Sequence, residues 1–514
     1  MRVGFRTRGY SRNCSVKQTR TTAKYNVALT PQSLTRLEVH LATSGSSLLP
    51  VRSVWRTCLT LCALVLLAAP ASARASLLAD RLEISMYGRV GLAWSPVTGK
   101  FIQGKTMNLT GGPQGGRLEE GDYLEPTIRF HLLEPKKDDP TAAYADVVLT
   151  PAMFANNGLF IGTFGNRNAQ TLQIELFQAY AEAGNILAPG LKLWAGARFY
   201  RGADVHIADY FYFNNLTGQG VGVTYGPLDV AVLLHTSAST TGDVYNFDSD
   251  GDGKADLRRQ RTMLVGQYVH KLEAGHSFHL LGEFHLLPEL QGARLADGTQ
   301  RDLPSDFGWV AGIKGHFSLG GDNFNDVSVR YGSRIASGSR SGSQTWDVLG
   351  PPGDNRLYSD AAGLEVVDHF LFNVSPLLSL NAYGILHWNQ GTERTLEVPG
   401  APASTVTDRW FDYSVGARST LYLSDYFHLI NEATYQGLRV GNGPMSNALK
   451  LSIVPTIVPT GQRSVWARPH LRLFYTIAFY DEDAVANLVS PYLQTMGGGS
   501  SIGHYVGARA EWWF

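Results

Sequence analysis

Polar and apolar residues alternate along many short segments of this chain, and no sustained 3.6-residue helical period is present. The alternation is clearest in four segments: residues 83–92, 123–132, 464–473 and 505–514. In the first of them, one face carries Glu83, Ser85, Tyr87 and Arg89, and the other carries Ile84, Met86, Val90 and Leu92. A period of two over about ten residues predicts β-strands with one apolar face.

This pattern is compatible with a soluble β-sandwich and with a transmembrane β-barrel, because alternation does not show whether the apolar face meets a core or lipid. The C-terminus favours the barrel, since the last segment stops on Phe514 with Trp512 two residues earlier, as in an interfacial aromatic girdle. No apolar stretch of about 18 residues follows residue 75, so a membrane-spanning form requires a closed barrel. We therefore predict an all-β fold, a transmembrane antiparallel β-barrel of the Gram-negative outer membrane.

The length of the chain predicts the size of this barrel. With about 24 residues for each strand and its share of loops, residues 76–514 supply about 18 strands. The long loops 237–259 and 332–360 are rich in glycine, serine and aspartate and are expected to face the cell exterior. Shorter turns such as 185–190 are expected on the periplasmic side.

Residues 1–75 are predicted to lie outside the barrel domain. Residues 57–70 form an apolar run, preceded by two arginines and followed by small residues at cleavage-site spacing, which is typical of a secretory signal peptide. At about 14 residues, the run is too short to cross a bilayer as a helix. We expect the mature chain to begin near Arg74 or Ser76, and we interpret residues 1–50 as a mis-called start, with translation beginning near Val51.

The charge of the chain changes when this segment is removed. The whole chain has 44 lysines and arginines and 44 acidic residues, of which 34 and 43 remain after residue 73. This acidic balance argues against nucleic acid as a partner. Cys14, Cys58 and Cys62, the only cysteines, precede the cleavage site, which excludes disulfides and cysteine-bound metal from the mature chain.

Aromatic residues recur on the predicted polar faces, next to charged residues. They are Tyr87, Tyr123, Phe324, Trp466 and Trp513. A plain aqueous pore does not need such rings, whereas the apolar face of a pyranose stacks on aromatic rings and its hydroxyls pair with charged groups. Each ring taken singly is more simply explained by packing. Their recurrence on five segments favours a channel for saccharides.

Residues 194–213, WAGARFYRGADVHIADYFYF, resemble the segment of maltoporins that runs from a strand into the constriction loop. Residues 87–94, 464–474 and 510–514 also resemble that family. The resemblance implies an 18-stranded antiparallel barrel, a homotrimer and a track of aromatic residues, the greasy slide, made of the same five residues. A sixth aromatic, from a neighbouring subunit, would be Phe160 or Phe164.

The resemblance also implies a polar track that would hydrogen-bond sugar hydroxyls. Its residues here are Arg89, Arg117, Glu125, Asp204 and Asp209. Two other interpretations of Asp204 and Asp209 are loop anchoring and a metal pair, although no third ligand stands at a useful spacing.

The chain departs from the maltoporin pattern at three positions. The constriction tyrosine is Phe211, and two lumen arginines of the family fall at Phe177 and Gly202, with Arg201 adjacent. A constriction with fewer arginines has a different charge balance. The departures therefore affect the prediction of maltodextrin specificity more than the prediction of sugar passage.

A separate acidic segment, residues 248–256, alternates carboxylates with small residues as in calcium loops of the D-x-D-x-D-G kind. Arg259 stands where the bidentate glutamate would be, and no helices are expected on either side. The segment is either a solvated acidic loop or a weak structural calcium site formed by Asp248, Asp250, Asp252 and Asp256. We expect no other cofactor.

The leading functional hypothesis is a passive channel for maltose-like or other oligosaccharides. A general, low-selectivity porin on the same scaffold is the alternative. An enzyme is not expected, because His206, His470 and His504 have no catalytic partner that the sequence places beside them. A receptor or assembly factor would usually carry a plug or soluble domain, and none is visible.

Overall fold

The computed structural model describes residues 81–514, except 113, 135, 137, 156–157, 159, 161–171, 236–245, 248–256, 295–299, 341–343 and 398–401. The predicted signal peptide and its cleavage site lie outside the described residues, as do Phe164 and the four aspartates of the candidate calcium loop. Within the described ranges, no helix is both long enough and apolar enough to cross a membrane.

One 18-stranded sheet contains all the long strands, and each strand pairs antiparallel with the next long strand along the chain. These strands are β1 (Leu82–Trp94), β2 (Tyr123–Leu133), β3 (Tyr144–Ala155), β4 (Leu172–Gly184), β5 (Lys192–Arg201), β8 (Asn215–Tyr225), β9 (Leu228–His235), β12 (Arg261–Lys271), β13 (Ser277–Leu287), β16 (Asp306–Ser318), β17 (Phe324–Arg334), β18 (Ala362–Ser375), β19 (Leu378–Gln390), β22 (Arg409–Tyr422), β23 (Phe427–Val440), β24 (Ser446–Ile457), β25 (His470–Tyr480) and β26 (Ile502–Trp513).

The remaining elements are short and lie in the connections between these strands. They are β6 (Asp204–Val205), η1 (His206–Ala208), β7 (Tyr210–Phe211), β10 (Asn246–Phe247), β11 (Leu257–Arg258), η2 (Glu273–Gly275), β14 (Leu290–Arg294), β15 (Gln300–Leu303), β20 (Arg394–Leu396), β21 (Ser404–Val406), α4 (Glu482–Ala486) and α5 (Pro491–Met496).

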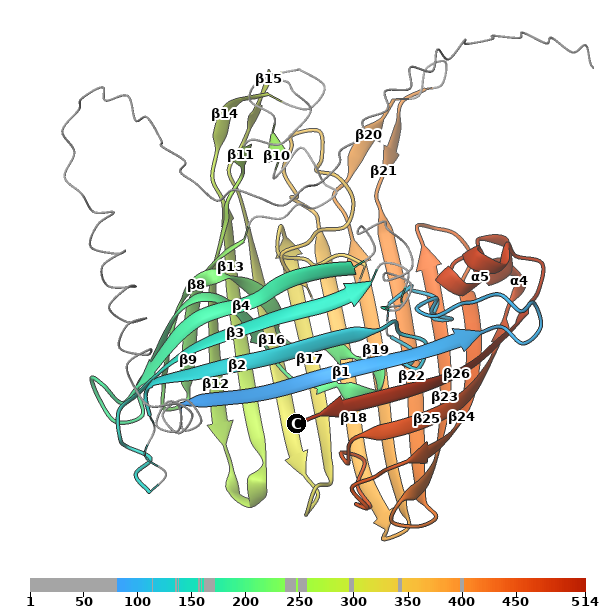
Figure 1. Cartoon of the computed structure of the whole chain (residues 1–514). Coiled ribbons are helices and arrows are strands. Elements are labelled where there is room, and N and C mark those ends of the chain that lie inside the picture. Colours follow the sequence, from blue (N-terminus) through green and yellow to red (C-terminus); the bar gives the residue numbers. More distant parts are fainter. Residues whose placement is uncertain are drawn as a thin grey trace, which may run out of the picture. The chain divides into compact units, whose positions relative to one another are not determined.

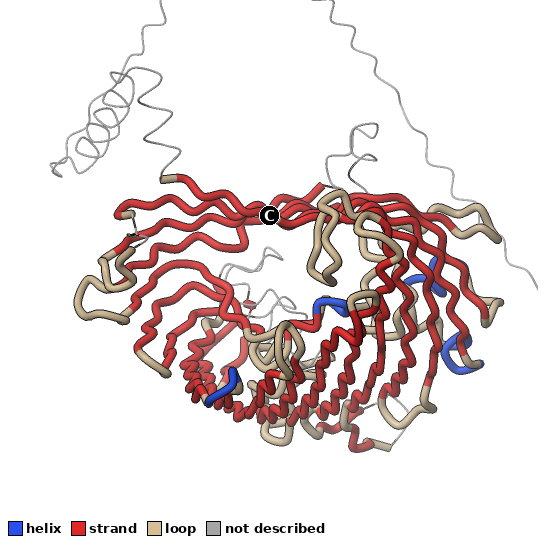
Figure 2. The backbone as a smooth tube through the Cα atoms, turned by 90° about the horizontal axis from the view of Figure 1, so that it is seen from below, coloured by secondary structure: helices blue, strands red, loops and turns tan. Residues whose placement is uncertain are grey.

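The last strand closes the sheet on the first, so that the strands form a ring around a lumen (Figures 1 and 2). β26 pairs with β1 from Trp513 opposite Tyr87 onward. Met86 and Phe514 exchange both backbone hydrogen bonds, at 3.0 and 3.2 Å. A closed sheet has no free edge, which satisfies the backbone groups as lipid requires. The prediction of about 18 antiparallel strands is confirmed.

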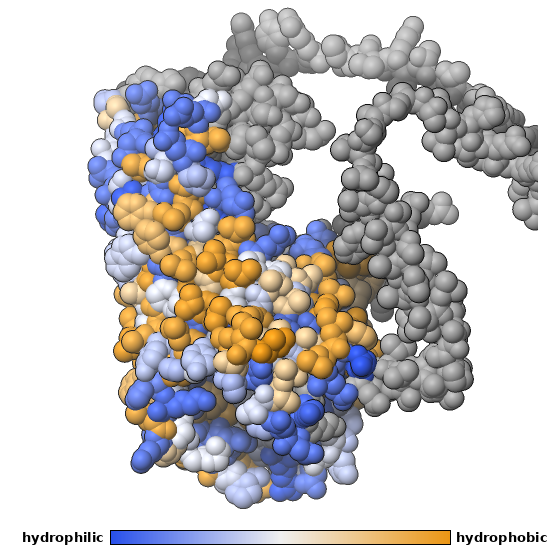
Figure 3. Space-filling view, turned by 90° about the vertical axis from the view of Figure 1, so that its left-hand side faces the viewer, coloured by the Kyte–Doolittle hydropathy of each residue, from blue (hydrophilic) through white to orange (hydrophobic). Residues whose placement is uncertain are grey.

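Side chains alternate between the lumen and the outer surface, as the period of two predicts. On β17, Asp326, Ser328 and Arg330 are buried, whereas Val327 and Val329 between them are exposed. On the outside, a belt of hydrophobic residues crosses the wall between two hydrophilic ends (Figure 3). This is the surface that a bilayer requires of a barrel.

Long and short connections fall at opposite ends of the strands. Residues 185–191 join β4 to β5, as expected, and residues 226–227 join β8 to β9, whereas residues 335–361 separate β17 from β18. Barrels of this kind place short turns in the periplasm and longer loops outside the cell. The expected loop 237–259 lies mostly outside the described residues.

One strand begins later than its sequence pattern suggested. The alternation from Ser464 predicted a strand from that point, but β25 begins at His470, and Trp466 lies in the preceding turn. Pro469 has no backbone N–H for a strand ladder, which favours a start after it.

Two loops fold into the lumen. In residues 95–122, Met107 is buried, and the Lys450 ammonium of β24 donates to Asn108 at 2.7 Å and to Glu119 at 2.9 Å. These contacts hold the loop against β24.

The second of these loops, residues 202–214, is called the inner loop below. The Tyr212 hydroxyl donates to Asp326 of β17 and the Phe213 N–H to Glu365 of β18, both at 3.0 Å. Buried apolar side chains of β8, β9, β12 and β13 pack in one cluster with this loop: Leu216, Leu233, Met263, Val265 and Leu281. The core therefore lies inside the barrel, and the inner loop narrows the lumen.

Candidate functional site

A cavity of about 570 Å³ lies in the lumen beside the inner loop. It is lined by Tyr87, Arg89, Arg117, Tyr123, Glu125, Arg201, Asp204, His206, Asp209, Phe211, Trp466 and Trp513. The fold thus brings together four of the five predicted slide aromatics and all six predicted polar-track and constriction residues. Their role in binding a sugar stays a prediction.

Two tryptophans and a histidine form one side of this cavity. The ring centroid of His206 lies 5.1 Å from that of Trp513, nearly perpendicular to it, and 6.0 Å from that of Trp466. The Arg468 guanidinium carbon lies 3.6 Å from the Trp513 ring centroid, a cation–π contact. Burial, with Arg117 and Arg468 nearby, lowers the pKa of His206 well below 6.5. The neutral ring therefore accepts a hydrogen bond from Arg468 at 3.1 Å.

Trp512 points away from the cavity, although it is next to Trp513 in the chain. Its indole nitrogen lies 3.5 Å from the sulfur of Met86. Its ring occupies the space where a side chain on Gly88 would lie. Met86 and Gly88 belong to the outward-facing positions of β1, so Trp512 lies on the lipid side.

Two arginines and two carboxylates form a paired cluster in the cavity wall. Glu120 lies 3.1 Å from both Arg89 and Arg117, and Asp209 lies 3.8 and 3.5 Å from the same arginines. Burial raises the pKa of Glu120 to about 6, against the opposing effect of the arginines. For Asp209 the arginines outweigh burial and lower the pKa to about 2. Arg117 also donates to the Tyr87 hydroxyl at 2.7 Å.

On another side of the cavity, the Arg201 guanidinium lies between two rings. Its central carbon is 3.6 Å from the ring centroid of Phe199 and 4.4 Å from that of Phe211. With the residues that the structure describes, Arg201 makes no hydrogen bond or ion pair, so its N–H groups can bind a ligand in the cavity. Glu125, which lines the same space, accepts a hydrogen bond from the Tyr123 hydroxyl.

The sequence pattern does not identify His206 as a residue of the site, and it places Arg201 only next to a position where the family has an arginine. Both lie in the 194–213 segment, close to Asp204. Their place in this segment, which resembles the constriction loop of the family, is the feature of the sequence that could have pointed to them. Alternation does not apply inside a loop, so the sequence did not show which loop side chains face the lumen.

Two predicted residues, Phe324 and Phe160, lie apart from the cavity lining. Phe324 is the first residue of β17, and its ring lies 5.0 Å from that of His369. Phe160 donates its N–H to Asp122 of the same chain at 2.9 Å. Within the described part of the chain, no group of three or more metal-ligating side chains occurs, so Asp204 belongs to no such group there.

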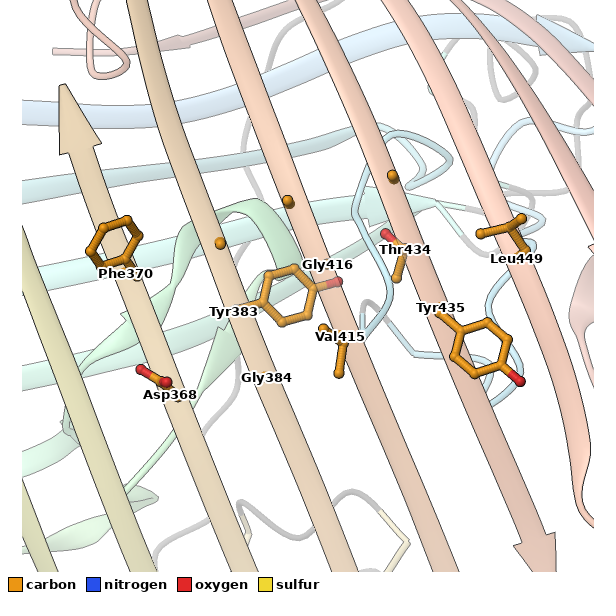
Figure 4. A pocket seen from close by; sticks show the side chains of 12 residues that line it. Asp368, Phe370, Tyr383, Gly384, Val415, Gly416, Thr434, Tyr435 and Leu449 are labelled. Carbon is orange, nitrogen blue, oxygen red and sulfur yellow. The ribbon is translucent and has the colours of Figure 1, made fainter. Parts of the chain in front are cut away.

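A second hollow, of about 480 Å³, lies in the outer wall across β18, β19, β22, β23 and β24 (Figure 4). Small residues at outward-facing positions create it: Ala382, Gly384, Ala417 and Ala433. Because it opens toward lipid, it is separate from the lumen.

The family model described as LamB porin matches residues 82–514 of this chain. Among solved structures, the chain is similar to the outer membrane channel DcaP of Acinetobacter baumannii, at 11% identity and a TM-score of 0.38, over 84% of this chain and 98% of that one. It is also similar to Pseudomonas putida OprB, at 9% identity and a TM-score of 0.37, over 86% of this chain and 96% of that one. A third similar structure is the anion-selective porin from Comamonas acidovorans, at 9% identity and a TM-score of 0.38, over 84% of this chain and 100% of that one.

Proposed function

Because the chain belongs to the LamB porin family, we propose that it carries saccharides across the outer membrane by facilitated diffusion. The family and the closed barrel establish a multi-pass outer-membrane porin, and the saccharide is the part that we propose. One observation supports it most: the cavity presents Tyr87, Tyr123, Trp466 and Trp513 to the same space as the arginines and carboxylates.

The cavity combines the two kinds of surface that a pyranose needs. Its rings can stack on the apolar C–H face of a sugar, at a gain of about 0.5–1.5 kcal/mol beyond area burial. Arg89 and Arg117 are paired with Glu120 and Asp209, so the cluster offers hydrogen bonds to hydroxyls without a large net charge. A neutral, polyhydroxylated ligand fits such a site.

We further propose that transport involves no catalysis and that three copies assemble in the membrane, as the family resemblance implies. Diffusion down a gradient requires no cofactor. Native mass spectrometry of the detergent-extracted protein tests the assembly, and a mass of one chain would contradict it.

Block of ion current by sugars tests the channel proposal. Single channels in planar bilayers are recorded while a panel of neutral saccharides is added, with polyethylene glycol of similar size as the control. Saturable block by at least one saccharide and not by the polymer is the expected result. If no saccharide blocks, the general porin is the correct function.

A further inference from the structure

A row of five aromatic rings runs across β1 to β5, which pair with one another in this order. The ribbons of β1 to β4 lie side by side in Figure 1. The rings are those of Tyr87, Tyr123, Phe154, Phe177 and Phe199. Successive ring centroids lie 6.0, 6.5, 6.4 and 5.5 Å apart. The first two rings line the cavity, and the three phenylalanines continue beyond its lining.

This row adjoins the long-loop end of the barrel. Tyr123 is the first residue of β2, Phe154 is the last but one of β3, and Phe199 lies two residues before the end of β5. Tyr123, Phe154 and Phe199 are half-buried, so part of each of these rings remains accessible. Since long loops face the cell exterior in such barrels, Phe154 and Phe199 lie toward the side from which a solute enters, and the ring of Phe177 lies between theirs.

Arg201 connects the row to the cavity. Its guanidinium stacks on Phe199 and also lines the cavity next to Phe211. Phenylalanine offers an apolar face and no hydrogen-bonding group, so the row alone can bind only through stacking and burial. Arg201 has no hydrogen-bond partner among the residues that the structure describes, so its N–H groups can supply donors where the row meets the charged residues.

We propose that Phe154, Phe177 and Phe199 form an outer binding branch for the trailing residues of a linear oligosaccharide whose leading residues occupy the cavity. This inference rests on the proposed saccharide transport. Consecutive rings at stacking distance match a ligand with several sugar rings in sequence, and a short sugar would fit in the cavity alone. The branch therefore makes binding depend on chain length.

The test compares sugar block across a series from disaccharide to heptasaccharide. Phe177 is the middle ring of the branch, and Phe177→Ala interrupts it. Block by the long sugars should weaken about two- to tenfold, the range expected for one lost stacking partner, and block by the disaccharide should not change. Phe177→Trp, which keeps a ring, should retain the affinity for long sugars.

Two further variants separate the possible results. Phe278 is exposed on the outer wall, so Phe278→Ala should leave block at every length unchanged. Trp513→Ala removes a ring of the cavity and should weaken block at every length. If Trp513→Ala behaves in this way but Phe177→Ala has no effect, or affects all lengths equally, the outer branch is refuted. If neither variant changes block by any sugar, the proposed saccharide transport is refuted with it.

Discussion

Trp512 and Trp513 are neighbours in the chain, yet their side chains meet different surroundings. Trp513 lines the cavity, and Trp512 contacts Met86 on the lipid side. The sequence could predict this contrast, because successive side chains of a strand point to opposite faces. It could not predict that Phe324 would lie outside the cavity. Alternation gives the face of a residue, whereas its height in the lumen depends on the tilt and stagger of the strands.

Replacing Trp513 by alanine should weaken sugar block by about 1 kcal/mol, since one stacking surface is lost. Ion conductance should stay the same or rise, because a bulky group has left the lumen. Trp512→Ala is the matched control and should lower barrel stability without a change in sugar affinity. Current recordings with increasing sugar measure both variants. An equal loss of block in the two variants would show that the assigned faces are wrong.

Ion selectivity should depend on pH through Glu120. A carboxyl group with a pKa of about 6 is charged at pH 7 and mostly neutral at pH 5. Asp209, with a pKa of about 2, remains charged over this range. Protonation removes one of the two negative charges that face Arg89 and Arg117, so the channel should become more selective for anions as the pH falls.

The measurement is the reversal potential in a salt gradient between pH 7 and pH 5. Glu120→Gln has no charge at either pH and should abolish most of the shift. If this variant shows the same shift as the unmodified protein, another group controls selectivity.

At the scale of the strands, aromatic rings pack over glycines of the neighbouring strand. Three such pairs lie in register: Tyr144 with Gly184, Tyr383 with Gly416, and Tyr413 with Gly437. A side chain added to any of these glycines would overlap the ring. The sequence predicted the strands but not these pairs, because strand register depends on loop lengths and on the partner strand. The late start of β25 has a local cause instead, because Pro469 lacks the backbone N–H that a strand ladder needs.

Two glycines on adjacent strands should respond oppositely to alanine. Gly384 of β19 has open space where a Cβ would lie, in the hollow of the outer wall. Gly384→Ala should stabilise the barrel by about 0.5–1 kcal/mol, because glycine is unfavourable inside a strand. At Gly416 of β22 the added Cβ would lie 2.6 Å from the Tyr383 ring, so Gly416→Ala should destabilise by about 1–3 kcal/mol.

Unfolding by urea in detergent micelles measures both changes. Sugar block should be the same for Gly384→Ala and the unmodified protein, which separates stability from binding. The same sign of change in both variants would contradict the ring–glycine interpretation.

For the whole molecule, strand number and closure were predictable, because chain length and the need to satisfy every backbone group in lipid lead to one architecture. The arrangement of the loops inside the barrel was not predictable from the sequence. The loops 95–122 and 202–214 fold inward through contacts with distant strands, such as Asn108 with Lys450 and Tyr212 with Asp326. Such contacts have no local sequence pattern. Polar residues on the inner face therefore serve two purposes, anchoring loops and lining the cavity.

The width of the pore should depend on two hydroxyl groups that anchor the inner loop across the lumen. The Tyr210 hydroxyl bonds Glu365, and the Tyr212 hydroxyl bonds Asp326. Hydrogen bonds to charged groups contribute about 1.5–3 kcal/mol each, so the double variant Tyr210→Phe with Tyr212→Phe should release the loop while keeping both rings. The 18 strands close without the loop, and the barrel should therefore remain folded.

We expect higher and noisier single-channel conductance, and weaker sugar block because His206 and Asp209 move with the loop. Tyr331→Phe, on the outer wall, is the control. Unchanged conductance in the double variant would show that the apolar cluster behind the loop holds it without these bonds.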